Sequence, residues 1–270
     1  MTRSLLPFLC ALPFLCGCPS EGTELEPPPD FVGDKDLSVY LFGAFDAAEP
    51  LEMVQGVEAL EAQLAPVDLL GDQSGRRWDG GAMLTEEDYG GATIWEGAQP
   101  LDQLIITVAG HSTHGPDKHA TLIPLADQTP FESSSSETYN RTIVGDSDCF
   151  VAQTCDVLET MNEVHRQNIL VNIWYDTPKF FRWVEMTDGR KALVARAWLE
   201  EPFSGESGNN TFEQFTALEV RIPDPDGGAI VYTSIWGDLK PSPGELVSSN
   251  TTANGIDEGW EKTDEYLDAQ

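Results

Sequence analysis

The segment FFRWVEMTDGRKALVARAWL, residues 180–199, decides the fold class of this 270-residue chain. Two runs rich in aromatic and aliphatic residues stand on either side of Thr187-Asp188-Gly189. An Asp-Gly pair between two such runs is a strong short-range signal for a β-hairpin. The segment therefore predicts two antiparallel strands, at residues 180–186 and 190–199, joined by a tight turn.

Further strands are predicted on both sides of this hairpin. Residues 168–175 and 216–222 alternate between two sets of side chains, which is typical of a strand. The turn residues Asp224-Pro225-Asp226-Gly227-Gly228 then lead into the apolar run 230–236. Because consecutive antiparallel strands usually pair as neighbours, we expect one curved sheet of about five to seven strands.

The first half of the chain mixes helical and extended patterns. Residues 50–64 predict a helix, because apolar side chains recur at the spacing of one buried helical face: Leu51, Val54, Val57, Leu60 and Leu64. Residues 37–45 and 104–108 predict strands by their aromatic and β-branched content, with 120–125 as the return partner of the second. Residues 71–100 and 130–148 predict mainly loops, and 157–165 a short helix.

The C-terminal residues predict one more helix. Ile256, Trp260, Thr263 and Leu267 fall at helical spacing and would close a short helix against the sheet. The expected fold class is therefore α+β, with residues 35–270 as a single globular domain.

The N-terminus carries the pattern of an export signal. Arg3 is followed by an apolar run of about a dozen residues, which is too short to span a bilayer. Leu15-Cys16-Gly17-Cys18 then resembles the lipobox of bacterial lipoproteins. The resemblance implies a signal peptide over residues 1–17 and acyl chains, palmitate among them, on Cys18. A plain signal peptide that is cut nearby is the alternative.

The residues after the lipobox predict a tether. Residues 18–34 are rich in Pro, Gly, Ser and acidic residues, a composition that buries little and stays extended. Pro19 follows the cysteine where an Asp would retain a lipoprotein in the inner membrane under the sorting rule of enteric bacteria. The resemblance therefore implies a location in the cell envelope, at the outer membrane.

Charge narrows the range of partners. The chain has 15 Lys and Arg against 46 Asp and Glu, a formal net charge of −31. Such a field repels nucleic acid and anionic lipid, so we expect neither as a partner. The membrane would then be held through the acyl chains and not through the surface of the domain.

Two cysteines remain after the signal peptide and the lipidated residue are set aside. In an exported chain Cys149 and Cys155 should form a disulfide, because the compartment is oxidising. A redox-active pair is the alternative, although the spacing is not Cys-x-x-Cys.

Three of the four histidines gather in Gly110-His111-Ser112-Thr113-His114 and the residues up to His119. The first part resembles the nucleophile elbow of α/β-hydrolases, with Ser112 as nucleophile and His111 and His114 as neighbours, but His114 stands where the second Gly should be. His111, His114 and His119 are also candidate ligands of a metal ion. A surface loop with incidental histidines is the competing interpretation, and no cofactor is expected.

Large aromatic side chains are the remaining clue. They either fill the core or line an apolar pocket, for which the candidates are Trp174, Trp183, Trp198, Tyr232 and Trp236. The order of strand, helix, curved sheet and terminal helix loosely resembles helix-grip (START-like) lipid-binding domains. That resemblance implies a cavity for a hydrophobic ligand.

These observations favour a lipid-anchored envelope protein with a non-catalytic binding or structural role, with a hydrophobic ligand or an envelope protein as partner. The alternative is a hydrolase or a metal-dependent enzyme centred on the segment from His111 to His119.

Overall fold

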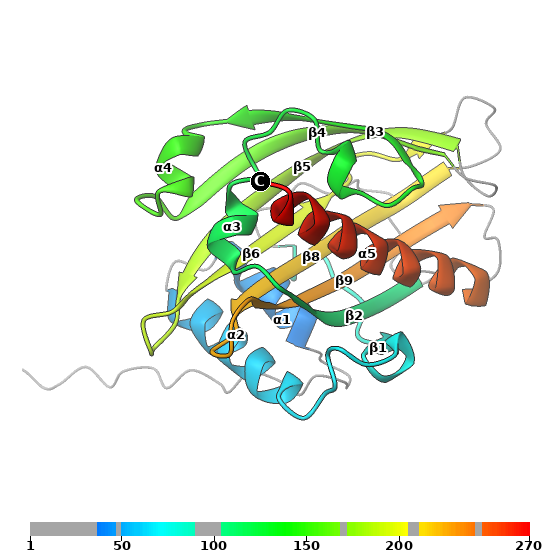
Figure 1. Ribbon diagram of the computed structural model, residues 1–270. Coiled ribbons are helices and arrows are strands. Elements are labelled where there is room, and N and C mark those ends of the chain that lie inside the picture. Colours follow the sequence, from blue (N-terminus) through cyan, green and yellow to red (C-terminus); the bar gives the residue numbers. More distant parts are fainter. Residues whose placement is uncertain (1–36, 47–49, 90–103, 168–171, 205–210, 241–244) are drawn as a thin grey trace, which may run out of the picture.

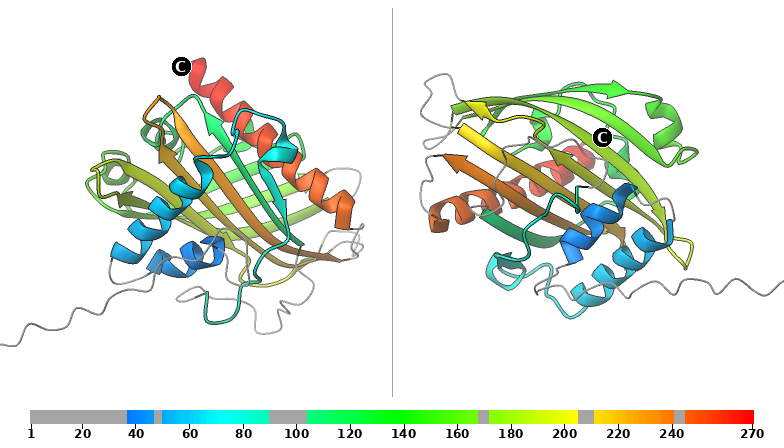
Figure 2. Two further views of the ribbon diagram at one scale, coloured as in Figure 1. Left: turned by 90° about the horizontal axis from the view of Figure 1, so that it is seen from below. Right: turned by 180° about the vertical axis from the view of Figure 1, so that it is seen from behind.

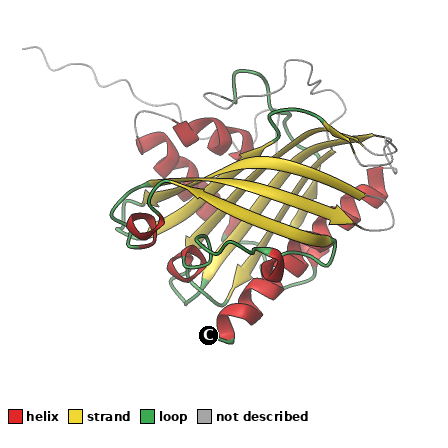
Figure 3. Ribbon diagram, turned by 90° about the horizontal axis from the view of Figure 1, so that it is seen from above, coloured by secondary structure: helices red, strands yellow, loops and turns green. Residues whose placement is uncertain are grey.

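The computed structural model describes residues 37–46, 50–89, 104–167, 172–204, 211–240 and 245–270. Within these ranges the chain is α+β, and one antiparallel sheet lies between helices on its two faces (Figures 1 and 3). The predicted signal peptide, Cys18 and the tether lie outside the described residues. No described helix is long and apolar enough to cross a membrane.

The sheet has nine strands in the described residues, more than the five to seven expected. Their bounds are β1 Arg77–Asp79, β2 Leu104–Ser112, β3 Ser136–Val144, β4 Val157–Gln167, β5 Asn172–Glu185, β6 Lys191–Trp198, β7 Phe203–Ser204, β8 Thr211–Pro223 and β9 Ala229–Lys240. Eight strands run in the order β1-β2-β9-β8-β6-β5-β4-β3, and the short β7 pairs with β8 off this path.

Helices cover both faces of the sheet. They are α1 Leu37–Gly43, α2 Pro50–Leu64, α3 Pro116–Ala120, α4 Ser147–Val151 and α5 Glu245–Asp268, with 3₁₀ turns η1 Ala44–Asp46, η2 Gln73–Gly75 and η4 Thr129–Phe131. Figure 2 shows α1 and α2 across one face, and α5 across the other. We call the face that carries α5 the inner face and the face that carries α1 and α2 the outer face.

The sheet curls around α5. This helix packs on β2 near one edge of the sheet and also on η4, which leads into β3 at the opposite edge. Phe131 of η4 meets Tyr266 of α5 edge to face, with ring centres 4.6 Å apart. Both edges therefore reach the same helix, and the inner face is concave (Figure 1).

The outer face holds the main apolar core. Helices α1 and α2 bury their apolar stripes there against β6, β8 and β9, with these side chains at its centre: Leu41, Phe42, Val57, Leu60, Val194, Leu218, Tyr232 and Trp236. Strand β2 is buried on both sides, with Ile105 and Ala109 in this core and Ile106 and Val108 under α5. Coverage on both sides explains why β2 has a continuous apolar run and no polar alternation.

Several sequence-based expectations are confirmed. The helix over 50–64 has the bounds of α2, and the turn at Thr187–Gly189 joins β5 and β6 with Glu185 paired to Lys191. The turn at Asp224–Gly228 likewise joins β8 and β9, where Pro223 pairs with Ala229. Long, regular patterns with clear turn residues were therefore sufficient to predict these elements.

Other expectations were wrong, each for a physical reason. Residues 37–45 form α1 and η1 and not a strand, because Leu37, Leu41 and Phe42 bury one helical side against the outer core. Residues 120–125 end α3 and turn without pairing as a strand. The C-terminal helix is not short, since α5 has 24 residues.

Two segments that were expected to be a helix and a loop are strands of the sheet. Residues 157–165 lie in β4, and the predicted loop 130–148 contains β3 and α4. In β4 every second residue is buried, but two of these, Thr160 and Asn162, are polar. An interior strand with a polar buried face has no visible apolar alternation in its sequence.

Candidate functional site

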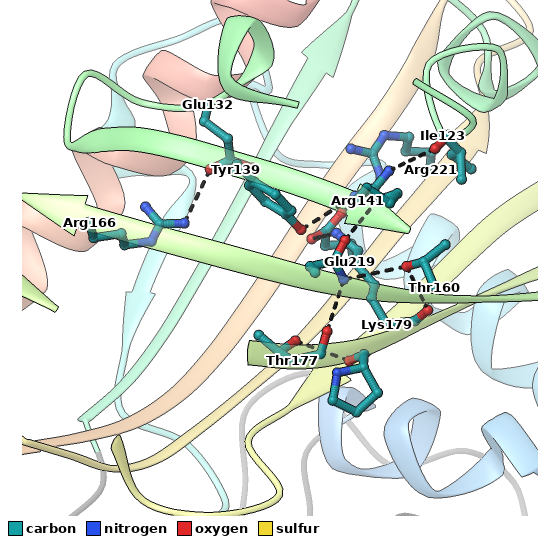
Figure 4. A network of polar contacts seen from close by, with 12 residues as sticks. Ile123, Glu132, Tyr139, Arg141, Thr160, Arg166, Thr177, Lys179, Glu219 and Arg221 are labelled. Atoms are coloured by element: carbon teal, nitrogen blue, oxygen red, sulfur yellow. Dashed lines mark hydrogen bonds and ion pairs between the residues drawn. The ribbon is translucent and has the colours of Figure 1, made fainter. Parts of the chain in front are cut away.

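A group of charged and polar side chains occupies the inner face, where strands β3, β4, β5 and β8 pass beneath the side that carries α5. We call Arg141, Lys179, Glu219 and Arg221 the inner polar cluster. Strand register places them on one face: Arg141 pairs with Asn162 and Thr160 with Lys179, and Lys179 pairs with Ala197, two residues from the Ala195 that pairs with Glu219. Figure 4 shows these side chains in one network.

Arg141 is a buried guanidinium whose hydrogen-bond partners are all uncharged. The residue is 8% exposed. Its Nε donates to Oδ1 of Asn162 at 2.8 Å, and its two Nη groups reach the carbonyl oxygen of Ile123 and the hydroxyl of Tyr139 at 3.3 Å each. No Asp or Glu in the described part of the chain forms an ion pair with it. Its positive charge is therefore not neutralised.

Glu219 is shared by two cations. Lys179 donates from Nζ to Oε1 at 2.5 Å, and Arg221 donates from Nη1 to Oε2 at 3.2 Å. Burial would raise the pKa of Glu219, but the positive charges of Lys179 and Arg221 outweigh it and lower the pKa to about 2. The carboxylate is ionised at neutral pH, so the cluster holds three cations and one anion.

A second ion pair lies on the same face and is balanced. Arg166 donates from Nε to the Tyr175 hydroxyl at 2.8 Å and from Nη2 to Glu132 at 3.1 Å. Burial raises the pKa of Tyr175, so its hydroxyl stays neutral. This pair contributes no net charge beside the inner polar cluster.

The charged side chains of the inner face are largely buried but keep some exposure. Burial is the largest influence on the pKa of Glu219, although 21% of its side chain is exposed. Lys179 and Arg221, which also point inward, are 11% and 17% exposed. The inward-facing Phe215 and Ile235 are half-buried as well, next to the small side chain of Ala217. These side chains are therefore partly accessible although helices cover this face of the sheet.

The predicted catalytic and metal-ligating residues are brought to the end of β2 but point to different partners. His111 contacts Asp224 at 3.2 Å, and His114 contacts Asp268 at 3.0 Å. His119 is buried and reaches Oγ of Ser112 at 2.8 Å. No group of three or more His, Cys, Asp or Glu in the described residues could hold a metal ion.

Ser112 joins three elements. Its Oγ donates to Oδ1 of Asp264 on α5 at 2.5 Å, and since a hydroxyl has one proton, Nε2 of His119 donates to Oγ. Burial is the main cause that lowers the pKa of His119, to about 2. A nucleophilic serine instead donates to a histidine whose other nitrogen is held by a carboxylate. Ser112 is also only 1% exposed, so this contact fastens α5 and α3 to β2.

The five aromatic pocket candidates do not share one surface. Trp198, Tyr232 and Trp236 belong to the outer core, whereas Trp183 packs on the inner face, stacked on Phe150 with ring centres 5.7 Å apart. Trp174 stacks on His165 with ring centres 3.8 Å apart. Sequence reasoning missed the inner polar cluster. Arg141 fell in a predicted loop, Lys179 between two predicted strands, and Glu219 and Arg221 simply alternated with apolar residues along a third. The signal that identifies them is coverage of the sheet on both sides.

Two further features lie away from the inner polar cluster. Cys149 and Cys155 form the predicted disulfide, which links α4 to the residues that follow it. A depression of about 360 Å³ lies at the start of α3 and the β5–β6 turn, with Asp117, Arg190 and Lys191 among its lining residues. It is open to solvent and lined by residues of both charges.

The sequence matches no protein-family model and no curated protein. Three solved structures align with it in part. A STAR-related lipid transfer protein of Xanthomonas axonopodis is 11% identical over 61% of this chain and 85% of that chain, with a TM-score of 0.40. A protein of Thermus thermophilus is 12% identical over 60% and 96%, with a TM-score of 0.41. Norcoclaurine synthase of Thalictrum flavum is 11% identical over 62% and 87%, with a TM-score of 0.35.

The first of these belongs to the class that the order of predicted elements resembles. With TM-scores of 0.41 and below, these likenesses carry no argument about ligand or activity.

Proposed function

We propose that the domain binds a hydrophobic ligand on its inner face, beneath α5, and that acyl chains on Cys18 hold the chain at the outer membrane. The observation that carries the binding role is the inner face itself. Charged side chains there lie deep in the molecule and are still 11–21% exposed, which supports an internal space and not a solid core.

The lining of this space suits a ligand with an apolar body. Phe215 and Ile235 are half-buried on the inner face, and Ala197 and Ala217 present little volume between them. On the α5 side, Trp260 and Ile256 pack beside Ile106 and Val108 of β2. An apolar chain placed there would be removed from water along most of its length, which is favourable by about 0.8 kcal/mol for each buried CH₂.

A neutral fluorescent probe tests the binding role. The full chain with Cys18→Ser should bind N-phenyl-1-naphthylamine with saturable enhancement of its fluorescence, and native mass spectrometry should detect co-purifying small molecules. Ala217→Phe, which adds a ring on the inner face, should weaken probe binding at least tenfold. The same substitution at the exposed Ala65 is the control.

Two outcomes would contradict this proposal. Absence of saturable binding in the Cys18→Ser chain removes the ligand-binding role. Equal binding by the Ala217→Phe and Ala65→Phe variants, with unchanged circular dichroism, would show that the binding site is not on the inner face.

The anchor is tested separately. Cys18→Ser should release a folded, soluble domain from membranes, whereas Cys10→Ser, in the apolar run of the signal, should leave the chain membrane-bound. Two or more acyl chains are needed for stable anchoring, so loss of the lipidated cysteine should be sufficient for release. Sedimentation of the Cys18→Ser chain with membranes would refute the anchor.

A further inference from the structure

The inner polar cluster carries excess positive charge in a protein that is otherwise strongly acidic. Arg141, Lys179 and Arg221 contribute three cations, and Glu219 is the carboxylate that pairs with two of them. The chain as a whole has a formal net charge of −31. Cations in the interior of such a protein would ordinarily be matched by some of its many carboxylates.

Arg141 is the least compensated of these cations. It is 8% exposed, and its partners Asn162, Ile123 and Tyr139 offer only neutral oxygen atoms. A buried charge without a counter-charge is costly, because the solvation that it loses is not replaced. The neutral partners fix the guanidinium in place but leave its charge available.

Two of the cations lie close to the same aromatic ring, that of Phe181. The guanidinium of Arg141 lies 5.2 Å from the ring centre of Phe181, and Nζ of Lys179 lies 5.3 Å from the same centre. A ring face attracts a cation but supplies no hydrogen-bond acceptor. Both charges are therefore held near one side chain without being neutralised by it.

Unused donor capacity is present in the same cluster. Nε of Arg221 is buried and has no hydrogen-bond partner in the described residues, while its Nη1 contacts Glu219. Guanidinium groups match the two oxygens of a carboxylate or a phosphate, and these charge-assisted bonds are stronger than neutral ones. The cluster supplies both the charge and the donors for one oxyanion.

We propose that the inner polar cluster is the head-group site for an anionic amphiphile, with Arg141 as the principal contact to a carboxylate or phosphate oxygen. This inference rests on the proposed function, because the apolar body of the same ligand would lie along the inner face. The Arg166–Glu132 pair is balanced and takes no part.

Three probes of equal tail length test the head-group site. Palmitate, hexadecyl phosphate and hexadecanol are titrated into the full Cys18→Ser chain, with displacement of the neutral fluorescent probe as readout. At least one of the two anions should bind tenfold or more tightly than hexadecanol. Which anion binds more tightly distinguishes a carboxylate head from a phosphate head.

Substitution of Arg141 should remove the preference and keep the tail affinity. In Arg141→Gln the affinity for the preferred anion should fall to within about threefold of that for hexadecanol, since an amide lacks the charge. Arg182→Gln is the matched control, because Arg182 lies on the same strand as Lys179 and contacts the carbonyl oxygen of Phe45 on the outer face. It should leave the preference unchanged.

The outcomes separate this inference from the proposed function. If none of the three compounds binds, the proposed function fails. If hexadecanol binds as tightly as both anions in the unsubstituted cluster, only the head-group site is overturned. The head-group site is likewise overturned if Arg141→Gln keeps the preference. Should Arg141→Gln fail to fold, thermal shifts of the Cys18→Ser chain decide, since the anion should raise Tm more than hexadecanol does.

Discussion

Gly228, in the turn between β8 and β9, has a backbone φ of +82°, and a Cβ there would lie 2.1 Å from the carbonyl oxygen of Ser112. Gly189, in the turn between β5 and β6, has a φ of +86° but open space around it. Gly189→Ala should cost about 1–2 kcal/mol of unfolding free energy, the strain of a left-handed residue. Gly228→Ala should cost clearly more, because the backbone of β2 must also move. Urea unfolding of both variants measures the difference, and equal losses would show that the close approach is relieved easily.

Lys179 and Glu219 permit a second test at the scale of single residues. Lys179→Met should destabilise the domain by about 3 kcal/mol, because it leaves a buried carboxylate with Arg221 as its remaining cation. The positive charge of Lys179 opposes the effect of burial on the pKa of Glu219, so that pKa should rise in the variant. In a double-mutant cycle with Glu219→Gln, the two losses should add to more than the loss of the double variant. Simple additivity would mean that the pair contributes nothing.

At the scale of elements, α5 is fastened by its own acidic residues. Asp257 accepts two hydrogen bonds from Arg76, at 2.8 and 3.0 Å, and a third from Gln73. Asp257→Asn should therefore lower the unfolding free energy by about 1.5–3 kcal/mol and speed amide exchange in α5. Glu261→Gln removes the same charge from an exposed position of the same helix and serves as control. Equal exchange in the two variants would contradict this role of Asp257.

The contact between α3, β2 and α5 gives the domain a defined response to acid. The pKa of His119 is about 2 in the folded chain against an ordinary value of 6.5, so the unfolded chain binds the proton more readily. The stabilisation from neutral His119 is full above pH 6.5 and declines as pH falls toward 2. Between pH 8 and pH 5 the Cys18→Ser chain should lose about 2 kcal/mol more than its His119→Gln variant, which keeps a donor for Ser112. Parallel pH profiles would contradict this assignment.

The elements that could be predicted from sequence are those whose residue pattern follows from a single structural requirement. Residues 50–64 bury one helical side, and Thr187-Asp188-Gly189 turns between two apolar runs, so spacing and turn chemistry were sufficient. Strands β3 and β4 could not be predicted, because their inward positions include Arg141, Thr160 and Asn162. Arg141 belongs to the inner polar cluster, and Asn162 accepts a hydrogen bond from it. Of the inner polar cluster only Arg141 therefore lies on a strand that escaped prediction, whereas β5 and β8, which carry its other members, were predicted as strands.

Across the whole molecule, charge is segregated between surface and interior. The 46 acidic residues give the chain its net charge of −31, while the inner polar cluster has three cations to one carboxylate. The acidic surface favours solubility and opposes adsorption to anionic lipid. An anionic ligand must therefore cross a repulsive outer field before it reaches an attractive interior.

This segregation predicts an unusual dependence of ligand binding on salt. Screening weakens the outer field first, since exposed charges are screened over a Debye length of about 10 Å at 0.1 M while buried pairs are screened much less. Raising the ionic strength from about 0.01 to 0.1 M, where the Debye length falls from about 30 to 10 Å, should speed association of palmitate severalfold and leave hexadecanol unaffected. Stopped-flow displacement of the neutral probe measures both rates in one protein. Arg141→Gln should keep the salt dependence of association, which belongs to the surface, and raise the dissociation rate, which belongs to the site. Slower palmitate association at higher salt would place the attractive charge on the outside of the molecule.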